Sequence, residues 1–425
     1  MAAVSAPMGL ASTTSYKVVL PFYGYAMISF LVATLLLLAH TDIVHENNFN
    51  PYTLTITHIM ALGWGTMIIL GASHQLLPVL IEGKLDSDLL AYLTFVCTAI
   101  GIPILAVGFY QFQFNWVLQT GAVLVNLGIL FYIINVFRSI IRSKKAEVHA
   151  WYMAAASLWL FSTTILGLIL VFNFSYTLLP ANSVSYLSVH AHLGIIGWFL
   201  MLVIGVASRL IPLFLISKYS SNQRLWEIFI LINSSLISFI VIRFLNISTY
   251  FYYIPAALSL VAIGLFGKYC RKAYWVRIRK NVDEQVKTSL LSIVQMAIPI
   301  LVLLVVLMLV PLGKHLNLII LYGFCIFFGW ISAIILGMTF KTLPFIVWNK
   351  VYSKRAHGTK TPAPKELFNE KVYKVMIILY LLGYLTFVVG ILFMNDYILK
   401  TGALALVISA VLYVYNTSIT LFHKI

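Results

Sequence analysis

Three histidines lie in segments that are otherwise apolar enough to cross a lipid bilayer. His190 and His192 belong to the run from Ser188 to Trp198, and His58 lies in an earlier apolar run. An ionisable side chain inside a membrane is costly unless it is paired or coordinated, so a site is the first hypothesis for such a residue. We therefore expect these imidazoles to bind a metal, a cofactor or a proton.

The composition is that of a membrane protein. Of 425 residues, 61% are hydrophobic and 9% are charged, and apolar runs recur along the whole length. The formal net charge of +16 would suggest nucleic acid in a soluble protein, but here the basic residues cluster in alternate loops and indicate membrane orientation. The three cysteines are far apart and have no metal-binding spacing. The expected partner is the lipid bilayer, and nucleic acid is not expected.

Twelve apolar runs are long enough to span a bilayer, which takes about 20 residues each. The loops after even-numbered runs carry the Lys and Arg residues, so the sequence predicts an integral protein of a bacterial-type inner membrane with both termini in the cytoplasm. The expected fold is all-α. The runs are approximately 17–40, 52–80, 87–110, 114–139, 151–174, 184–216, 225–245, 249–269, 286–312, 316–347, 372–394 and 398–421.

The second, sixth and tenth runs repeat one pattern. Each has a Gly-Trp pair, a Gly eight residues after the first Gly and a Pro fifteen residues after it: Gly63, Gly71 and Pro78; Gly197, Gly205 and Pro212; Gly329, Gly337 and Pro344. This spacing predicts three pseudo-symmetric four-helix units, at approximately 16–145, 146–282 and 283–425, within one transmembrane domain of residues 1–425. We expect the repeated helices to form an inner ring with three pores between the units.

The histidines separate into three groups. Histidines expected in loops or at chain ends are treated as solvated, and those at the outer interface as interfacial. His74 lies near the cytoplasmic end of its helix, and we interpret it as a structural hydrogen-bonding residue in preference to a ligand. The solvated group is His45, His149, His357 and His423, and the interfacial pair is His40 and His315.

His58, His190 and His192 are expected at similar depth near the outer ends of their helices. Positions two apart on an α-helix point roughly 200° from each other, so His190 and His192 must face different pores. If His58 and His192 each face the next unit, His190 and His58 converge on one pore. Two facing imidazoles suit a bis-histidine haem. Zinc would need further donors, a three-histidine copper site is the next alternative, and structural hydrogen bonds between helices remain open. In the third unit Tyr322 and Phe324 take the places of His190 and His192.

Twelve helices in three quartets, with His-Ala-His before Gly-Trp and an earlier helix carrying its own outer histidine, resemble subunit I of the haem–copper oxidases and its relatives, including nitric-oxide reductases and NnrS-like haem proteins. The resemblance implies that His58 and His190 bind one low-spin haem and that His192 is the proximal ligand of a second haem or is spare. The family carries its His-x-His on the tenth helix, whereas here it is on the sixth. The seventh run, 225–245, lacks the family's copper-binding histidine pair, so copper is not expected.

The expected function is that of a b-type haem protein with one or two haem groups, in electron transfer or in binding or reducing a small gas such as NO or O2. Arg243, Lys314 and Lys400, near the outer side, are candidate partners for haem propionates. A redox partner or other membrane subunits are candidate protein partners. Two alternatives stay open: a transporter or channel that uses the histidines as substrate or proton sites, and a non-catalytic assembly subunit on the same scaffold.

Overall fold

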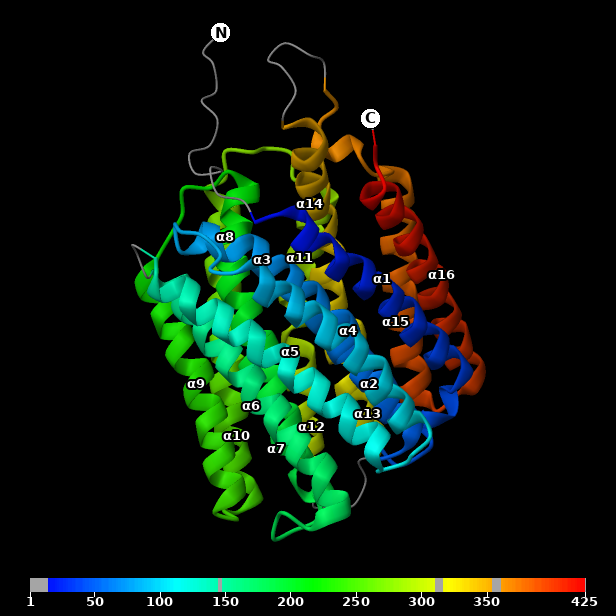
Figure 1. Cartoon of the computed structure of the whole chain (residues 1–425). Helices are drawn as coiled ribbons and strands as arrows, with labels where there is room; N and C mark the ends of the chain where they lie inside the picture. Colours follow the sequence, from blue (N-terminus) through cyan, green and yellow to red (C-terminus); the bar gives the residue numbers. More distant parts are fainter. Residues whose placement is uncertain (1–13, 144–146, 310–315, 354–360, 425) are drawn as a thin grey trace.

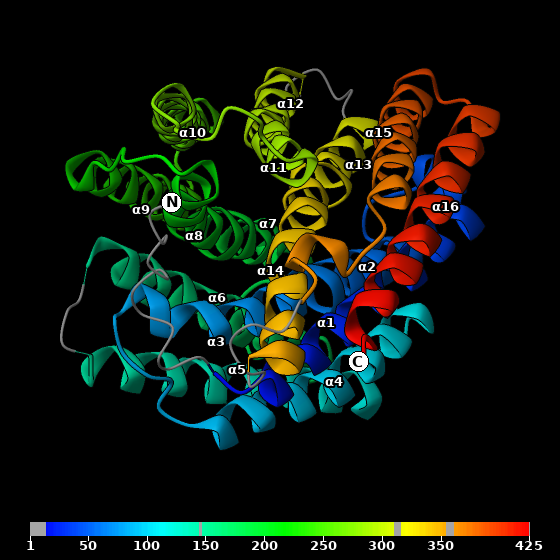
Figure 2. The same cartoon turned by 90° about the horizontal axis from the view of Figure 1, so that it is seen from above.

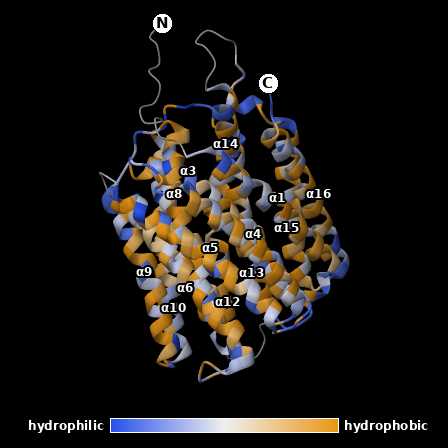
Figure 3. Ribbon diagram, in the orientation of Figure 1, coloured by the Kyte–Doolittle hydropathy of each residue, from blue (hydrophilic) through white to orange (hydrophobic). Residues whose placement is uncertain are grey.

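A computed structural model describes residues 14–143, 147–309, 316–353 and 361–424 of the chain. Across these residues twelve helical spans are long and apolar enough to cross a membrane, so the protein is an all-α polytopic membrane protein, as the sequence predicts (Figure 1). Apolar residues cover the sides of the bundle, and hydrophilic residues gather at its two ends (Figure 3). The bilayer is therefore the solvent for its flanks.

The spans follow one another with short connections. In order they are α1 (Tyr16–Ala39), α2 (Pro51–His58) with η3 (Ile59–Thr66) and α3 (Met67–Leu80), α4 (Asp88–Tyr110), α5 (Trp116–Ile141), α6 (Val148–Tyr176), α7 (Leu187–His192) with η5 (Leu193–Leu200) and α8 (Met201–Leu215), α9 (Asn222–Phe244), α10 (Tyr253–Trp275), α11 (Glu284–Gln295) with α12 (Ala297–Leu309), α13 (Leu316–Phe324) with η8 (Cys325–Ile331) and α14 (Ser332–Tyr352), α15 (Glu370–Phe393), and α16 (Asp396–Leu421). Short 3₁₀ turns are η2 (Thr41–Val44), η4 (Ser183–Tyr186), η6 (Thr249–Tyr252) and η9 (Pro364–Glu366).

Many of the helix starts are set by local side-chain chemistry. An Asn or Ser precedes seven of the spans, and its side-chain oxygen accepts a hydrogen bond from a backbone N–H of the first turn. Asn50 illustrates this, because its Oδ1 accepts from Thr53 N at 2.8 Å and Pro51 follows it as the first helical residue. The others are Ser87, Asn115, Asn182, Ser221, Asn369 and Asn395.

The three helices that carry the Gly-Trp pattern are the most buried. The spans Pro51–Leu80, Ser183–Leu215 and Leu318–Tyr352 are 72%, 78% and 78% buried, whereas the other nine spans are between 33% and 50% buried. Seen from above, α3, α8 and α14 lie near the middle of the bundle (Figure 2). The repeated helices thus occupy the interior, while the pseudo-symmetry of the three complete units stays a prediction.

The repeated glycines permit close approach between each inner helix and the first helix of its own quartet. A Cβ added at Gly71 would lie 2.6 Å from Phe22 Cβ of α1, and one added at Gly337 would lie 2.5 Å from Ser289 Oγ of α11. At Gly205 the added atom would collide with Tyr152 of α6. Small residues at helix crossings are the usual means of bringing transmembrane helices together, so this part of the repeat has a packing explanation.

Each inner helix widens into a π-helical segment at the same place in the repeat. The segments η3, η5 and η8 begin directly after His58, His192 and Phe324, and each contains a Gly-Trp pair. Two of the tryptophans link neighbouring inner helices: Trp64 Nε1 donates to Ser332 Oγ and Trp198 Nε1 donates to Thr66 Oγ1, both at 3.1 Å. Such π-helical turns are frequent at functional sites.

The expectation that His149 is solvated is wrong. It lies in the first turn of α6, is only 5% exposed, and its Nδ1 is 3.1 Å from Gly205 O and 3.3 Å from Ser208 Oγ. Helix α6 therefore begins before its apolar run and includes His149. The buried imidazole is tolerated there because it has hydrogen-bond partners. Of the other histidines expected to be solvated, His45 bonds the Asp396 carboxylate at 2.8 Å, and His357 lies outside the described residues.

Candidate functional site

His58 and His190 line one cavity, which we call the bis-histidine cavity. Its volume is about 180 Å³, and it lies among α2, α4, α5, α6 and α7 with the π segments η3 and η5. Apart from the two imidazoles its walls are mostly apolar and aromatic. They include Phe49, Phe109, Phe174, Trp198, Phe199 and Phe327.

Both imidazoles of this cavity are held through the same ring atom. His58 Nδ1 is 2.7 Å from Leu54 O, and His190 Nδ1 is 3.0 Å from Thr163 O. A carbonyl oxygen only accepts, so each Nδ1 carries the proton and donates, and each Nε2 keeps its lone pair. This is the arrangement by which proteins orient histidines that bind metals.

The separation of the two rings matches a shared metal ion. Their centres are 6.4 Å apart and their planes differ by 23°. Bonds from imidazole to a metal are about 2 Å, so two rings bound on opposite sides of one ion have centres roughly 6 Å apart. The His58 ring also stacks on Phe109, with ring centres 4.4 Å apart, which limits its rotation.

A glycine of α6 makes room for the second ring. A Cβ added at Gly167 would lie 2.8 Å from His190 Cε1, closer than real contacts allow. Gly167 therefore lets α6 pass directly behind the imidazole, while the same helix supplies the Thr163 carbonyl that holds it. Neither contact was predicted from the sequence, because both depend on the pairing of α6 with α7.

Asn126 of α5 is a polar member of the cavity that sequence reasoning missed. Its Nδ2 donates to Ala122 O and Thr164 O, each at 2.9 Å, which fixes the orientation of the amide. Its Oδ1 is buried and has no hydrogen-bond partner in the described parts of the chain. An asparagine in the middle of a transmembrane run was the available signal. This oxygen can accept a hydrogen bond from a donor group of a molecule in the cavity.

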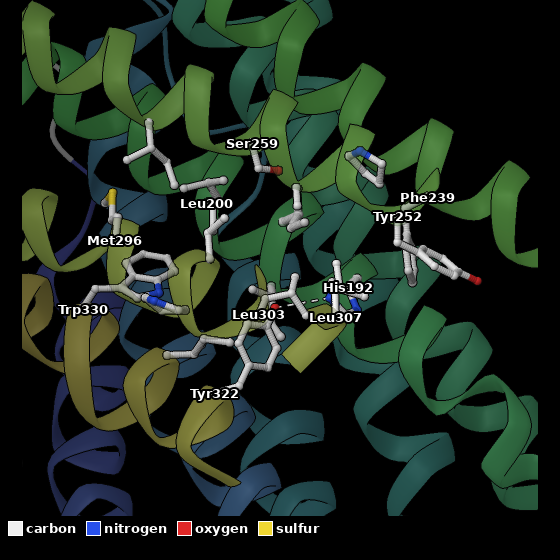
Figure 4. Close-up of a pocket in the computed structure, with 18 residues that line it drawn as sticks. His192, Leu200, Phe239, Tyr252, Ser259, Met296, Leu303, Leu307, Tyr322 and Trp330 are labelled. Carbon is white, nitrogen blue, oxygen red and sulfur yellow. Dashed lines mark hydrogen bonds between the residues drawn. The ribbon is translucent and has the colours of Figure 1, made fainter. Parts of the chain in front are cut away.

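His192 points into a different cavity, which we call the His192 cavity (Figure 4). Its volume is about 90 Å³, half that of the bis-histidine cavity. His192 Nδ1 is held by Ser188 O at 2.7 Å, and its Nε2 is 3.2 Å from the hydroxyl of Tyr322. The ring centres of His192 and Tyr322 are 6.0 Å apart, with planes that differ by 24°. The two histidines of the His-Ala-His sequence therefore serve opposite sides of one helix.

The other predicted site residues lie elsewhere. Arg243 Nη2 donates to Ser185 O at 2.7 Å and lines neither cavity, and Lys400 is an exposed residue of α16. Lys314 falls outside the described residues. His74 is buried, and neither of its ring nitrogens has a hydrogen-bond partner among the described residues.

Each cavity has few side chains that could bind a metal ion. Within the described parts of the chain, no group of three or more His, Cys, Asp or Glu side chains gathers in a way that could hold a metal ion. The bis-histidine cavity has two imidazoles among its lining residues. Comparison with models of known protein families and with curated protein sequences finds no match for this chain.

Proposed function

We propose that this chain is a b-type haem protein of the membrane, with His58 and His190 as the axial ligands of one low-spin haem. One observation carries the proposal: two imidazoles, each held through Nδ1, line one cavity with ring centres 6.4 Å apart. Imidazole is a common axial ligand of haem iron. The apolar and aromatic walls suit a flat macrocycle, and the residues present therefore fit this cofactor.

Electron transfer is the activity that this ligand pair favours. A haem bound here would be held by His58 and His190 and would supply an iron that can gain and lose one electron. The carbonyls of Leu54 and Thr163 hold the two Nδ1 protons, so the imidazoles keep their orientation and tautomer. Phe109 and Phe199 help to exclude water from the cavity. Binding or reduction of NO or O2 would need an open iron position, which a second haem on His192 would have to offer.

The relationship to subunit I of the haem–copper oxidases is part of the proposal. Its support is the pattern of three inner helices that carry Gly-Trp, two of them with histidine directly before a π-helical segment. The proposal further places the protein in a bacterial-type inner membrane, with both termini in the cytoplasm and the bis-histidine cavity near the outer surface. It includes no copper centre.

Absorbance spectroscopy tests the assignment. Purified protein should show a Soret band and low-spin haem bands, and the pyridine haemochrome should report haem b. His58→Ala and His190→Ala should each lose the low-spin signal, because one ligand cannot replace the pair. His74→Ala is the matched control, since His74 is also a buried histidine of a span but lines neither histidine cavity. A protein without a Soret band, or with a band unchanged in both ligand variants, would refute the proposal.

A further inference from the structure

The His192 cavity has mostly apolar walls with a few polar side chains among them. It lies between η5 on one side and α10, α12 and α13 with η8 on the other. Trp330 lies on one side of the His192–Tyr322 pair, Phe239 and Tyr252 lie on the other side, and Leu303 belongs to the apolar lining (Figure 4). The outer faces of α10 and α12 expose Val261, Leu301 and Val305, so these helices separate the cavity from lipid.

Trp330 differs from the other two tryptophans of the repeat. Its side chain is 3% exposed and lines the His192 cavity, and its indole nitrogen makes no hydrogen bond to another described residue. The equivalent tryptophans, Trp64 and Trp198, donate to Ser332 and Thr66. Each of these hydroxyls stands two residues after the tryptophan of its own helix.

Leu200 explains why the third bond is missing. It stands two residues after Trp198, at the position where the other two helices have Thr66 and Ser332, and it lines the cavity together with Trp330. A ligand in the cavity that accepts a hydrogen bond from the Trp330 N–H would gain the free energy of that bond. The repeat thus makes one of three equivalent donors available to this cavity.

His192 and Tyr322 can serve as acceptor and donor. His192 donates through Nδ1 to Ser188 O, so its Nε2 accepts the hydrogen bond of the Tyr322 hydroxyl. A ligand carbonyl could accept from Tyr322 in place of this bond. A ligand hydroxyl could instead donate to His192 Nε2. This pair therefore accommodates both a carbonyl and the hydroxyl formed when that carbonyl is reduced.

We infer that the His192 cavity binds the head group of a lipid-soluble quinone. A flat ring with an oxygen at each end would accept from Trp330 at one oxygen and pair with Tyr322 and His192 at the other. Tyr322 lies in α13 and Trp330 lies in η8, so both groups come from one membrane span and line the same cavity. The inference concerns binding alone and does not depend on haem in the bis-histidine cavity.

Binding of a short-tailed quinone to the full chain tests the inference. The protein is placed in nanodiscs of synthetic phosphatidylcholine, which contain no quinone, and titrated with decyl-benzoquinone in a calorimeter. We expect saturable binding of one quinone per chain. Trp330→Phe should weaken it about five- to tenfold, the value of one hydrogen bond. Leu200→Ser should also weaken it, because the new hydroxyl would engage the Trp330 N–H.

Trp64→Phe is the matched control. It also removes one indole N–H from the inner helices, but Trp64 lines neither histidine cavity, so affinity should stay unchanged. Equal loss in Trp64→Phe and Trp330→Phe, or no saturable binding to the unmodified chain, would overturn the inference. A haem that is lost on His192→Ala would also overturn it, because that haem would occupy the cavity. A Soret band that is unchanged in Trp330→Phe would separate this result from failure of the haem proposal.

Discussion

The two histidine cavities have almost the same ring geometry and different donors. His58 and His190 have ring centres 6.4 Å apart, and His192 and Tyr322 have ring centres 6.0 Å apart, with planes inclined by 23° and 24°. In both pairs one residue stands five positions before a Gly-Trp pair and the other stands seven positions before the next pair along the chain. The second cavity is therefore the counterpart of the first, with tyrosine where the first has its second histidine.

The tyrosine of the second pair occupies the free nitrogen of its histidine. The Tyr322 hydroxyl hydrogen-bonds to His192 Nε2, whereas His58 Nε2 and His190 Nε2 have no partner among the described residues. A neutral imidazole whose Nδ1 is protonated has only one lone pair, on Nε2, so the hydrogen bond to Tyr322 competes directly with a metal. Under the proposed function, the first cavity binds a metal-bound cofactor, whereas the second has its imidazole engaged in a hydrogen bond.

The largest expected effect comes from removing one histidine of the His-Ala-His sequence at a time. His190→Ala should reduce haem occupancy by more than about 100-fold. Removing a residue that binds the metal directly has a larger effect than removing a residue that only hydrogen-bonds to such a ligand. His192→Ala should leave that haem bound, since His192 lies on the opposite side of the helix. Haem per protein, measured by pyridine haemochrome, distinguishes the two. The reverse result would contradict the assignment of the cavities.

Exchanging the differing residue should convert one cavity into the other. Tyr322→His would place a second imidazole opposite His192, and haem content should rise towards two per chain. His190→Tyr should do the opposite at the first cavity and abolish the low-spin signal. Absorbance and iron content measured together test both changes. If Tyr322→His binds no additional haem, the ring geometry alone does not define a haem site.

A smaller effect is expected from the glycine behind His190. Gly167→Ala would place a Cβ 2.8 Å from His190 Cε1 and should displace the imidazole ring. We expect haem affinity to fall about tenfold, which is the effect of losing a residue that orients a metal ligand. Gly128→Ala is the matched control, because a Cβ there would lie 2.6 Å from Thr98 Cγ2, a similarly close contact, and Gly128 lines neither histidine cavity. Haem titration of the apoprotein gives both affinities. Equal losses would show that general packing, and not the position of His190, is responsible.

The smallest effect is expected at Arg243. Arg243→Gln should change haem affinity by less than about twofold, because the side chain bonds Ser185 O and does not line the bis-histidine cavity. Lys400→Gln, at an exposed position of α16, should be equally neutral. The same haem titration measures both variants. A large loss in Arg243→Gln would show that the guanidinium reaches a propionate after haem binds.

Much of the fold follows from the sequence because a bilayer imposes simple rules. Unpaired backbone groups are excluded from lipid, so twenty apolar residues in a row form a helix, and the predicted spans agree with the twelve found among the described residues. His149 shows where this reasoning fails. The apolar run begins after it, but the helix extends back to include it, since Gly205 and Ser208 of a neighbouring helix provide partners.

For the site, the sequence by itself determined which helices carry the imidazoles and which pair of them could meet, because helical geometry forces residues two apart onto different faces. Only the tertiary structure decided what surrounds them. The Thr163 carbonyl and Gly167 come from α6, Asn126 comes from α5, and the partnerless Trp330 results from Leu200 on another inner helix. These relations join residues far apart in the chain, and they arise only when the helices pack against one another.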